Sequence, residues 1–164
     1  MRYDESLFSS PVPSALLPRD AEVIFVADYF PEQVLGGAEL TLQALVDTAP
    51  VKTHKVLASE LTIEHLKQGA QKYWVFGNYV SLNPQLLPVI AANVRYSIVE
   101  CDYKFCRFRS VEKHESEGGS KCDCHETQLG NVISSFMSAA EHVWWMSEQQ
   151  RKVYHDRFAF LTDY

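Results

Sequence analysis

The chain has 164 residues, of which 46% are hydrophobic, and a formal net charge of −6 with a pI near 5.5. This length and composition can bury one substantial core, which indicates a single globular domain and excludes a disordered chain. The acidic balance makes a nucleic acid an unfavoured partner, because neutralising phosphates over a wide surface needs a basic face. Only a local basic patch is compatible with it.

The first 20 residues, MRYDESLFSSPVPSALLPRD, are expected to form an N-terminal arm that precedes a folded domain of residues 21–164. The arm carries Asp4 and Glu5 where a secretory signal peptide would be basic, and three prolines interrupt its least charged part. No window approaches ~18 uninterrupted apolar residues, so no membrane span is expected. These features predict a cytoplasmic protein.

Strands and helices alternate along the expected domain. Five short runs rich in apolar, β-branched and aromatic residues predict strands buried within a sheet, at 22–27, 54–58, 72–77, 95–100 and 142–146. Helical spacing and capping residues predict helices after them, at about 38–49, 62–69, 84–92, 129–140 and 147–157. Asn83 is the expected cap of the third helix, with Pro84 at its first position.

This alternation implies βαβ units with right-handed crossovers. The predicted fold is therefore α/β, a Rossmann-like open parallel sheet in a three-layer α/β/α sandwich. Trp144 and Trp145 of the last strand point to opposite faces of the sheet, and core packing under helices is the expected role of both rings.

Residues 101–127 break the alternation and are expected to be a Cys/His-rich insertion after the fourth strand. Zinc takes four thiolate or imidazole ligands in a tetrahedron, and a flexible segment with a CxC pair and a separate Cys and His can wrap it. The predicted ligands of a structural zinc are Cys106, His114, Cys122 and Cys124. Cys101 and His125 are substitute ligands. The alternatives are free thiols and, less favoured without a secretory signal, disulfides.

The loop after the first strand contains a glycine pair, Gly36 and Gly37, immediately before a predicted helix. Ligands of open α/β sheets bind at the carboxyl ends of the strands, and a helix N-terminus there favours an anion. The alternative is a tight turn without a ligand. The spacing is neither GxGxxG nor GxxxxGK[ST], which disfavours a standard dinucleotide fingerprint and a P-loop.

Two stretches resemble the N-terminal domain of GT-B-type glycosyltransferases. VIFVADYFPEQVLGGAELTLQALV resembles its opening, where a strand, a loop containing proline and GG-A-E lead into the first helix, and VWWMSEQQRKVYHDRF resembles its end. The resemblance covers about residues 22–158 and rests on short motifs. In such enzymes two Rossmann-like domains face each other across a cleft, and the N-terminal domain mainly holds the sugar acceptor.

The resemblance implies a cleft for donor and acceptor at the strand tips, lined by Asp28, Tyr29, Gly36, Gly37, Glu39, Asn78 and Asp102. Glu39 has an alternative role as a first-turn carboxylate that complements the helix dipole, and the other polar tips are alternatively turn or cap residues. The chain ends at Tyr164, where a complete enzyme would continue into a domain that binds the nucleotide sugar. We therefore expect the acceptor-side half of a glycosyltransferase, inactive alone, whose partners are a sugar acceptor and a second donor-binding domain or subunit.

A non-catalytic binding module is the alternative function. In that hypothesis the zinc-stabilised insertion recognises a protein or a nucleic acid. Under either hypothesis Lys104, Arg107 and Arg109 of the insertion, interleaved with aromatic residues, could meet an acceptor or an anionic partner. Solvated charges and packed rings are the simpler interpretation of so short a run.

Overall fold

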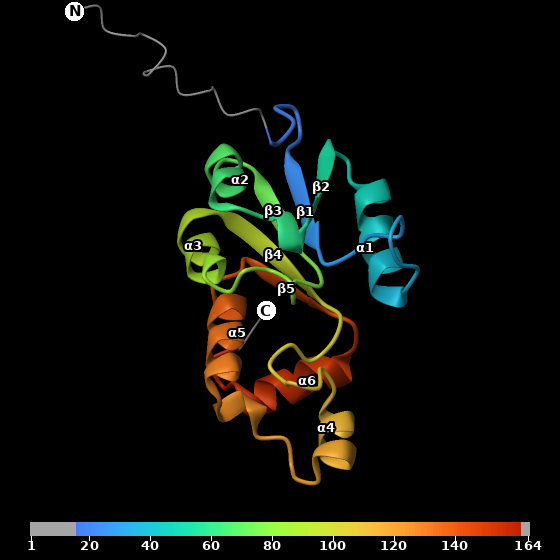
Figure 1. Cartoon of the computed structure of the whole chain (residues 1–164), viewed down its shortest axis with the longest axis vertical. Coiled ribbons are helices and arrows are strands. Elements are labelled where there is room, and N and C mark those ends of the chain that lie inside the picture. The colour runs from blue at the N-terminus through green and yellow to red at the C-terminus, as the bar shows by residue number, and fades with distance from the viewer. Residues whose placement is uncertain (1–15, 162–164) are drawn as a thin grey trace, which may run out of the picture.

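The computed structural model of the protein describes residues 16–161, and its fold is α/β (Figure 1). Most of the predicted N-terminal arm and the last three residues lie outside the described residues. A single five-stranded parallel sheet has the order β2-β1-β3-β4-β5, which confirms the predicted open, Rossmann-like parallel sheet. Its strands are β1 (Val23–Ala27), β2 (Thr53–Leu57), β3 (Tyr73–Phe76), β4 (Arg95–Glu100) and β5 (His142–Trp145).

Helices cover the two faces of the sheet unequally. Helix α1 lies against one face, whereas α2, α3 and α5 lie against the other, as Figure 1 shows. Helix α6 follows β5, and the short helix α4 and the 3₁₀ turn η3 belong to the segment between β4 and α5. Their bounds are α1 (Gly37–Thr48), η2 (Ala58–Glu60), α2 (Ile63–Gln68), α3 (Leu86–Asn93), α4 (Val111–Gly118), η3 (Cys124–Glu126), α5 (Gln128–Ser138) and α6 (Glu148–Arg157). No helix among the described residues is long and apolar enough to cross a membrane.

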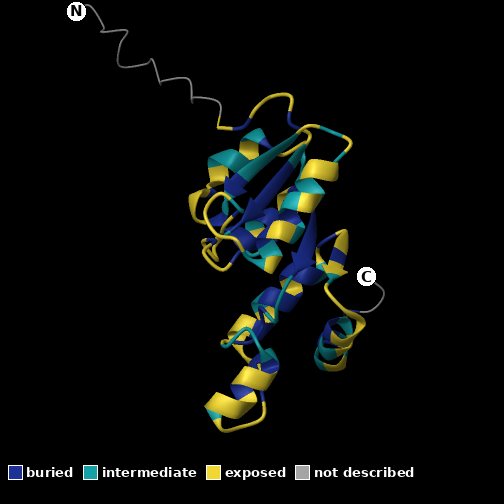
Figure 2. Cartoon of the chain, turned by 90° about the vertical axis from the view of Figure 1, so that its right-hand side faces the viewer, coloured by how far each residue is buried: buried dark blue, intermediate teal, exposed yellow. Residues whose placement is uncertain are grey.

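The apolar run of β1 explains its central position. Ile24 and Val26 pack into the larger core under α2, α3 and α5, and Phe25 and Ala27 pack into the smaller core under α1. All four side chains are buried, because successive residues of a strand point to opposite faces and both faces are covered here. Figure 2 shows this concentration of buried residues in the sheet and the largely exposed α4 at the opposite end of the molecule.

Aromatic contacts fix α5 on the sheet. The ring of Tyr96 in β4 stacks on Phe136 of α5 with 4.7 Å between centroids, and the Tyr96 hydroxyl donates a hydrogen bond of 2.6 Å to the Phe136 carbonyl. The stacking and the satisfied buried hydroxyl together hold the C-terminal part of α5 against β4.

The parallel register brings the carboxyl ends of the strands to one edge. Val26 of β1 pairs with Phe76 of β3, which in turn pairs with Ile98 of β4. Beyond the ladder, the N–H of Asp28 donates to the carbonyl of Asn78 at 2.7 Å. The residues predicted to line a cleft therefore follow neighbouring strands at this edge.

Two sequence predictions differ from the structure. Helix α3 begins at Leu86, two residues later than expected, although the Asn83 side chain accepts the N–H of Gln85 at 3.1 Å as a capping residue does. Trp144 is 43% exposed, so the expected burial of both tryptophans is wrong for this ring. The reason is that helix α6 packs on the side of β5 opposite Trp144, where the rings of Trp145 and Tyr154 lie 4.8 Å apart.

Candidate metal centre and sheet edge

Four buried side chains after β4 form a compact cluster of metal-ligating groups. They are the predicted set, Cys106, His114, Cys122 and Cys124, and their ligand atoms all lie within 4.8 Å of one another. Each side chain is at most 5% exposed. One cysteine precedes α4, the histidine lies on it, and the other two cysteines follow it. The segment therefore folds back on itself around these four groups.

The spacing of the ligand atoms fits a tetrahedron. The sulfurs of Cys106 and Cys122 are 3.7 Å apart, and Nδ1 of His114 lies 3.5 Å from the Cys106 sulfur and 3.3 Å from the Cys124 sulfur. A zinc ion with Zn–S bonds of about 2.3 Å separates tetrahedral sulfurs by about 3.8 Å. A disulfide would need about 2.0 Å. All four cysteines are free thiols, so the group could hold a metal ion such as zinc.

Two turns deliver the ligands. The N–H of Cys106 donates to the carbonyl of Tyr103 at 2.8 Å, and the N–H of Arg109 donates to the carbonyl of Cys106 at 2.8 Å. The Ser110 hydroxyl then accepts the N–H of Lys113 and caps α4, which places His114 one turn into the helix.

A glycine makes room for the histidine. A Cβ on Gly118 would lie 2.7 Å from Cδ2 of His114, closer than such contacts normally occur. Gly119 then ends α4 in the left-handed conformation, with φ of 69°, which glycine adopts without strain. The glycine pair is therefore explained by the space that the His114 ring needs and by the left-handed residue that ends α4.

The protonation of Cys122 would change on binding of a cation. Burial, with the neighbouring thiols of Cys106 and Cys124 as smaller causes, raises the pKa of Cys122 to about 12. Without a metal this thiol would stay protonated at neutral pH, and a bound divalent ion would stabilise the thiolate. Three sulfurs and one imidazole are a donor set that suits zinc.

The two substitute ligands lie outside the cluster. Cys101 packs with the smaller core on the α1 side of the sheet, and burial raises its pKa to about 11. His125 directs Nε2 toward the Glu126 carboxylate at 3.7 Å, and its ring lies edge-on to Phe158. Neither belongs to the group of four ligand atoms found among residues 16–161.

Three of the predicted cleft residues make internal contacts at the strand tips. The Asp28 carboxylate accepts the N–H groups of Val80 and Ser81 at 3.0 and 2.8 Å, and the Ser81 hydroxyl at 2.6 Å. Arg109 donates to the Asn78 side chain at 3.1 Å and pairs with the carboxylate of Asp102. These contacts join the loop after β3 to the segment that carries the metal ligands.

The glycine loop lies beside these tips and is open. Tyr29 is 52% exposed, and Gly36 is the extended N-cap of α1. A Cβ on Gly36 would collide with the carboxylate of Glu39, which is itself buried. A Cβ on Gly37 would meet no described atom within 4 Å. A shift of the flexible Glu39 side chain would make room at Gly36, and Gly37 already faces open space, so packing against the fold requires neither glycine.

A buried ion pair near the same edge was missing from the sequence prediction. Nζ of Lys104 lies 3.1 Å from the carboxylate of Glu100 and 3.5 Å from that of Asp102. The side chains of Lys104 and Glu100 are almost fully buried. Burial raises the pKa of Glu100 to about 7, although Lys104 opposes that shift. The i, i+4 spacing of opposite charges across the end of β4 was the available signal. Gln150 of α6 donates to the Asp102 carbonyl at 3.1 Å and ties the last helix to this pair.

Comparison of the chain with protein-family models, with curated proteins and with solved structures finds no match. The function is therefore argued from the geometry of these residues.

Proposed function

We propose that this domain is the acceptor-side half of a nucleotide-sugar-dependent glycosyltransferase of the GT-B type, with residues 101–127 held in place by a structural zinc. The observation that carries the proposal is the open space around Gly37 at the carboxyl end of β1. A glycine that packing does not require, at the first turn of a helix beside the strand tips, suits a backbone that a ligand approaches closely.

The groups around Gly37 suit a sugar. The Glu39 carboxylate lies over Gly36, and the exposed Tyr29 ring stands on the same loop. Carboxylates accept hydrogen bonds from hydroxyl groups, and an exposed aromatic ring offers an apolar face together with a polar tip. In the proposed reaction these residues bind and orient the acceptor, while a partner domain holds the donor and its leaving diphosphate.

The zinc has a structural role in this proposal. Four protein ligands fill a tetrahedral zinc, so no position is open for a catalytic water. The metal instead fixes the segment whose Arg109 bridges Asn78 and Asp102 at the rim of the proposed cleft. Loss of the metal should therefore loosen one wall of the acceptor site.

The test is a titration of the zinc-loaded chain, labelled with ¹⁵N, with methyl glycosides of glucose, galactose, mannose and N-acetylglucosamine. We expect at least one glycoside to shift the amide signals of Tyr29, Gly36 and Gly37. The Gly37→Ala variant should bind that glycoside about tenfold more weakly, the loss expected when one hydrogen-bonded approach is blocked. Its melting temperature should not fall, because the new methyl group meets open space and alanine favours a helix.

A matched control is Thr48→Ala, at the exposed last residue of α1 and thus at the end of the helix opposite the glycine loop. It should bind the glycoside as the unmodified chain does. Folded, zinc-loaded protein whose loop signals respond to none of the four glycosides would contradict the proposal and favour a non-catalytic binding module.

A further inference from the structure

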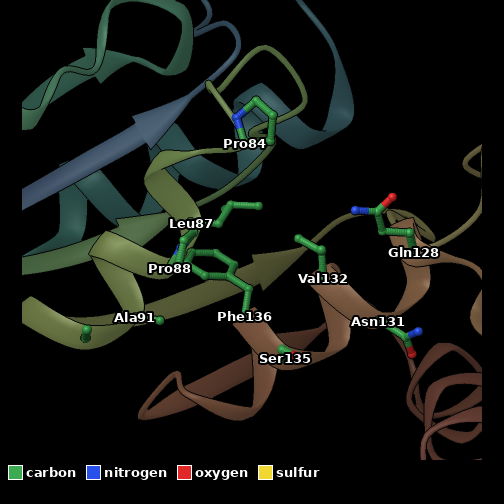
Figure 3. Close-up of a pocket in the computed structure, with 10 residues that line it drawn as sticks. Pro84, Leu87, Pro88, Ala91, Gln128, Asn131, Val132, Ser135 and Phe136 are labelled. Atoms are coloured by element: carbon green, nitrogen blue, oxygen red, sulfur yellow. The ribbon is translucent and has the colours of Figure 1, made fainter.

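A groove separates α3 from α5 on the face of the sheet opposite α1 (Figure 3). Its volume is about 810 Å³, and its walls are mainly apolar. Figure 3 shows Leu87 and Val132 reaching toward each other from the two helices, with Phe136 deeper in the groove. Gln128 and Asn131 stand along the α5 side.

A second hollow of about 300 Å³ continues the groove toward residues 101–127, called the metal segment below because it carries the candidate metal ligands. Pro84, Leu87 and Val132 line both spaces, so the two are adjacent parts of one cleft. The far wall of the second hollow includes Cys106, one of the candidate metal ligands, and therefore depends on the fold of the metal segment.

The second hollow is cationic. Lys104, Arg107 and Arg109 line it, and its described lining contains no carboxylate. Lys104 forms an ion pair with Glu100, and Arg109 forms one with Asp102. Arg107 is exposed, and no carboxylate among residues 16–161 lies within ion-pair distance of it. A net positive charge is thus available at this end of the cleft.

Two buried polar groups at this end have no partner. The Tyr79 hydroxyl and Nε of Arg109 are enclosed and make no hydrogen bond in the described structure, and Tyr79 is only 3% exposed. Unsatisfied buried donors are uncommon, because each costs about 1–3 kcal/mol. Both residues line the hollow, so an anion placed there would accept hydrogen bonds that the chain does not supply.

The N-terminus of α5 adds to the positive potential. Its first-turn residues Gln128 and Leu129 line the groove and the hollow respectively. The amide ends of a helix of 11 residues favour an anion at this position. Cationic side chains, buried donors and a helix terminus therefore converge at one end of an apolar groove.

We propose that this cleft binds an amphipathic anion, a single apolar chain with a phosphate or carboxylate head. The apolar chain lies between α3 and α5, and the head lies against Arg107, Arg109 and the Tyr79 hydroxyl. The apolar groove alone, at about 810 Å³, is within the range of small-molecule sites, about 300–1,000 Å³. This cleft is a different space from the proposed sugar site around Gly37, and the two share Arg109, which lines the second hollow and also contacts Asn78 and Asp102 at the rim of the sugar site.

The test is isothermal titration of the zinc-loaded chain with decyl phosphate below its micelle concentration. Decanol and inorganic phosphate are the comparison ligands, since decanol has only the apolar chain and phosphate has only the anionic head. We expect decyl phosphate to bind at least about tenfold more tightly than either, because a hydrogen-bonded charge contributes about 1.5–3 kcal/mol. Decanoate should also bind.

Two variants map the site. Ser135→Trp places a large ring in the groove from an exposed position, and Arg107→Gln removes the unpaired charge. Each should weaken decyl phosphate binding by about tenfold. The controls are Leu40→Trp on exposed α1 and Lys152→Gln on exposed α6, which should bind within about twofold of the unmodified chain. Ala92→Trp replaces the first variant if that protein does not fold.

Three outcomes would overturn the proposal. Decyl phosphate does not bind, or it binds the Ser135→Trp and Arg107→Gln variants as tightly as the unmodified chain. In the third, the protein binds only vesicles of phosphatidylcholine with phosphatidic acid, which indicates a membrane surface and no enclosed chain.

Discussion

Replacing Cys106 by serine is expected to abolish the zinc-dependent stability of the protein. This thiol is 1% exposed and lies 3.7 Å from the sulfur of Cys122 and 3.5 Å from Nδ1 of His114. A hydroxyl is a poor zinc ligand, so the variant retains two thiols and one imidazole. Structural zinc sites almost always have four protein ligands, so loss of one thiolate should weaken zinc binding strongly.

The size of the effect follows from ligand linkage. A metal that binds only the folded chain stabilises it by about 2.7 kcal/mol at a hundredfold excess over its Kd, and by about 4.1 kcal/mol at a thousandfold excess. For a chain of this length, 1 kcal/mol shifts Tm by about 2–4 °C. We therefore expect zinc to raise the Tm of the unmodified chain by roughly 5–15 °C, and the Tm of the Cys106→Ser variant by less than about 2 °C.

The assay is thermal unfolding followed by circular dichroism, with zinc or with a chelator. Cys101→Ser is the matched control, because its thiol packs against the smaller core and lies outside the ligand group. It should keep the zinc response. The reasoning would be refuted if Cys106→Ser responded to zinc like the unmodified chain, or if Cys101→Ser lost the response.

Three further predictions concern single side chains. Burial holds the pKa of Glu100 at about 7 in the folded chain, above its ordinary 4.5, so unfolding releases a proton between these values and stability falls as pH rises through them. Glu100→Gln should remove about 3 kcal/mol of this pH dependence, measured by urea unfolding across the interval. Gly118→Ala should weaken zinc binding by at least about tenfold in a competition with a chromophoric chelator, because its methyl group would displace His114. Tyr96→Phe should lower the free energy of unfolding by about 1 kcal/mol in urea through loss of its hydrogen bond to the Phe136 carbonyl.

The alternation of strands and helices could be predicted because it depends on local patterns. The run of β1 is apolar on both faces, and only a strand covered on both sides needs that composition. The four residues of the candidate metal centre were also predictable, since thiols and imidazoles are the side chains that best suit zinc and residues 101–127 contain only six of them. The sequence analysis chose the same four and kept Cys101 and His125 as substitutes, and the tertiary structure excludes Cys101 because it packs on the other face of the sheet.

The hydrogen bonds and ion pairs of the residues at the strand tips could not be predicted, because their partners are distant in sequence. Arg109 reaches Asn78 across 31 positions, and Asp28 reaches Ser81 across 53. The exposure of Trp144 has the same origin, since it follows from the side of β5 on which α6 packs. Sequence patterns predict which residues alternate along a strand, whereas the partners at its end are set by the whole fold.

X-ray absorption at the zinc edge, combined with metal analysis, tests the metal centre most directly. The protein purified under metal-replete conditions should contain about one zinc per chain, with three sulfur ligands at about 2.3 Å and one nitrogen at about 2.0 Å. Less than ~0.2 zinc per chain, or a ligand shell dominated by oxygen, would contradict the assignment of Cys106, His114, Cys122 and Cys124 as a structural zinc site.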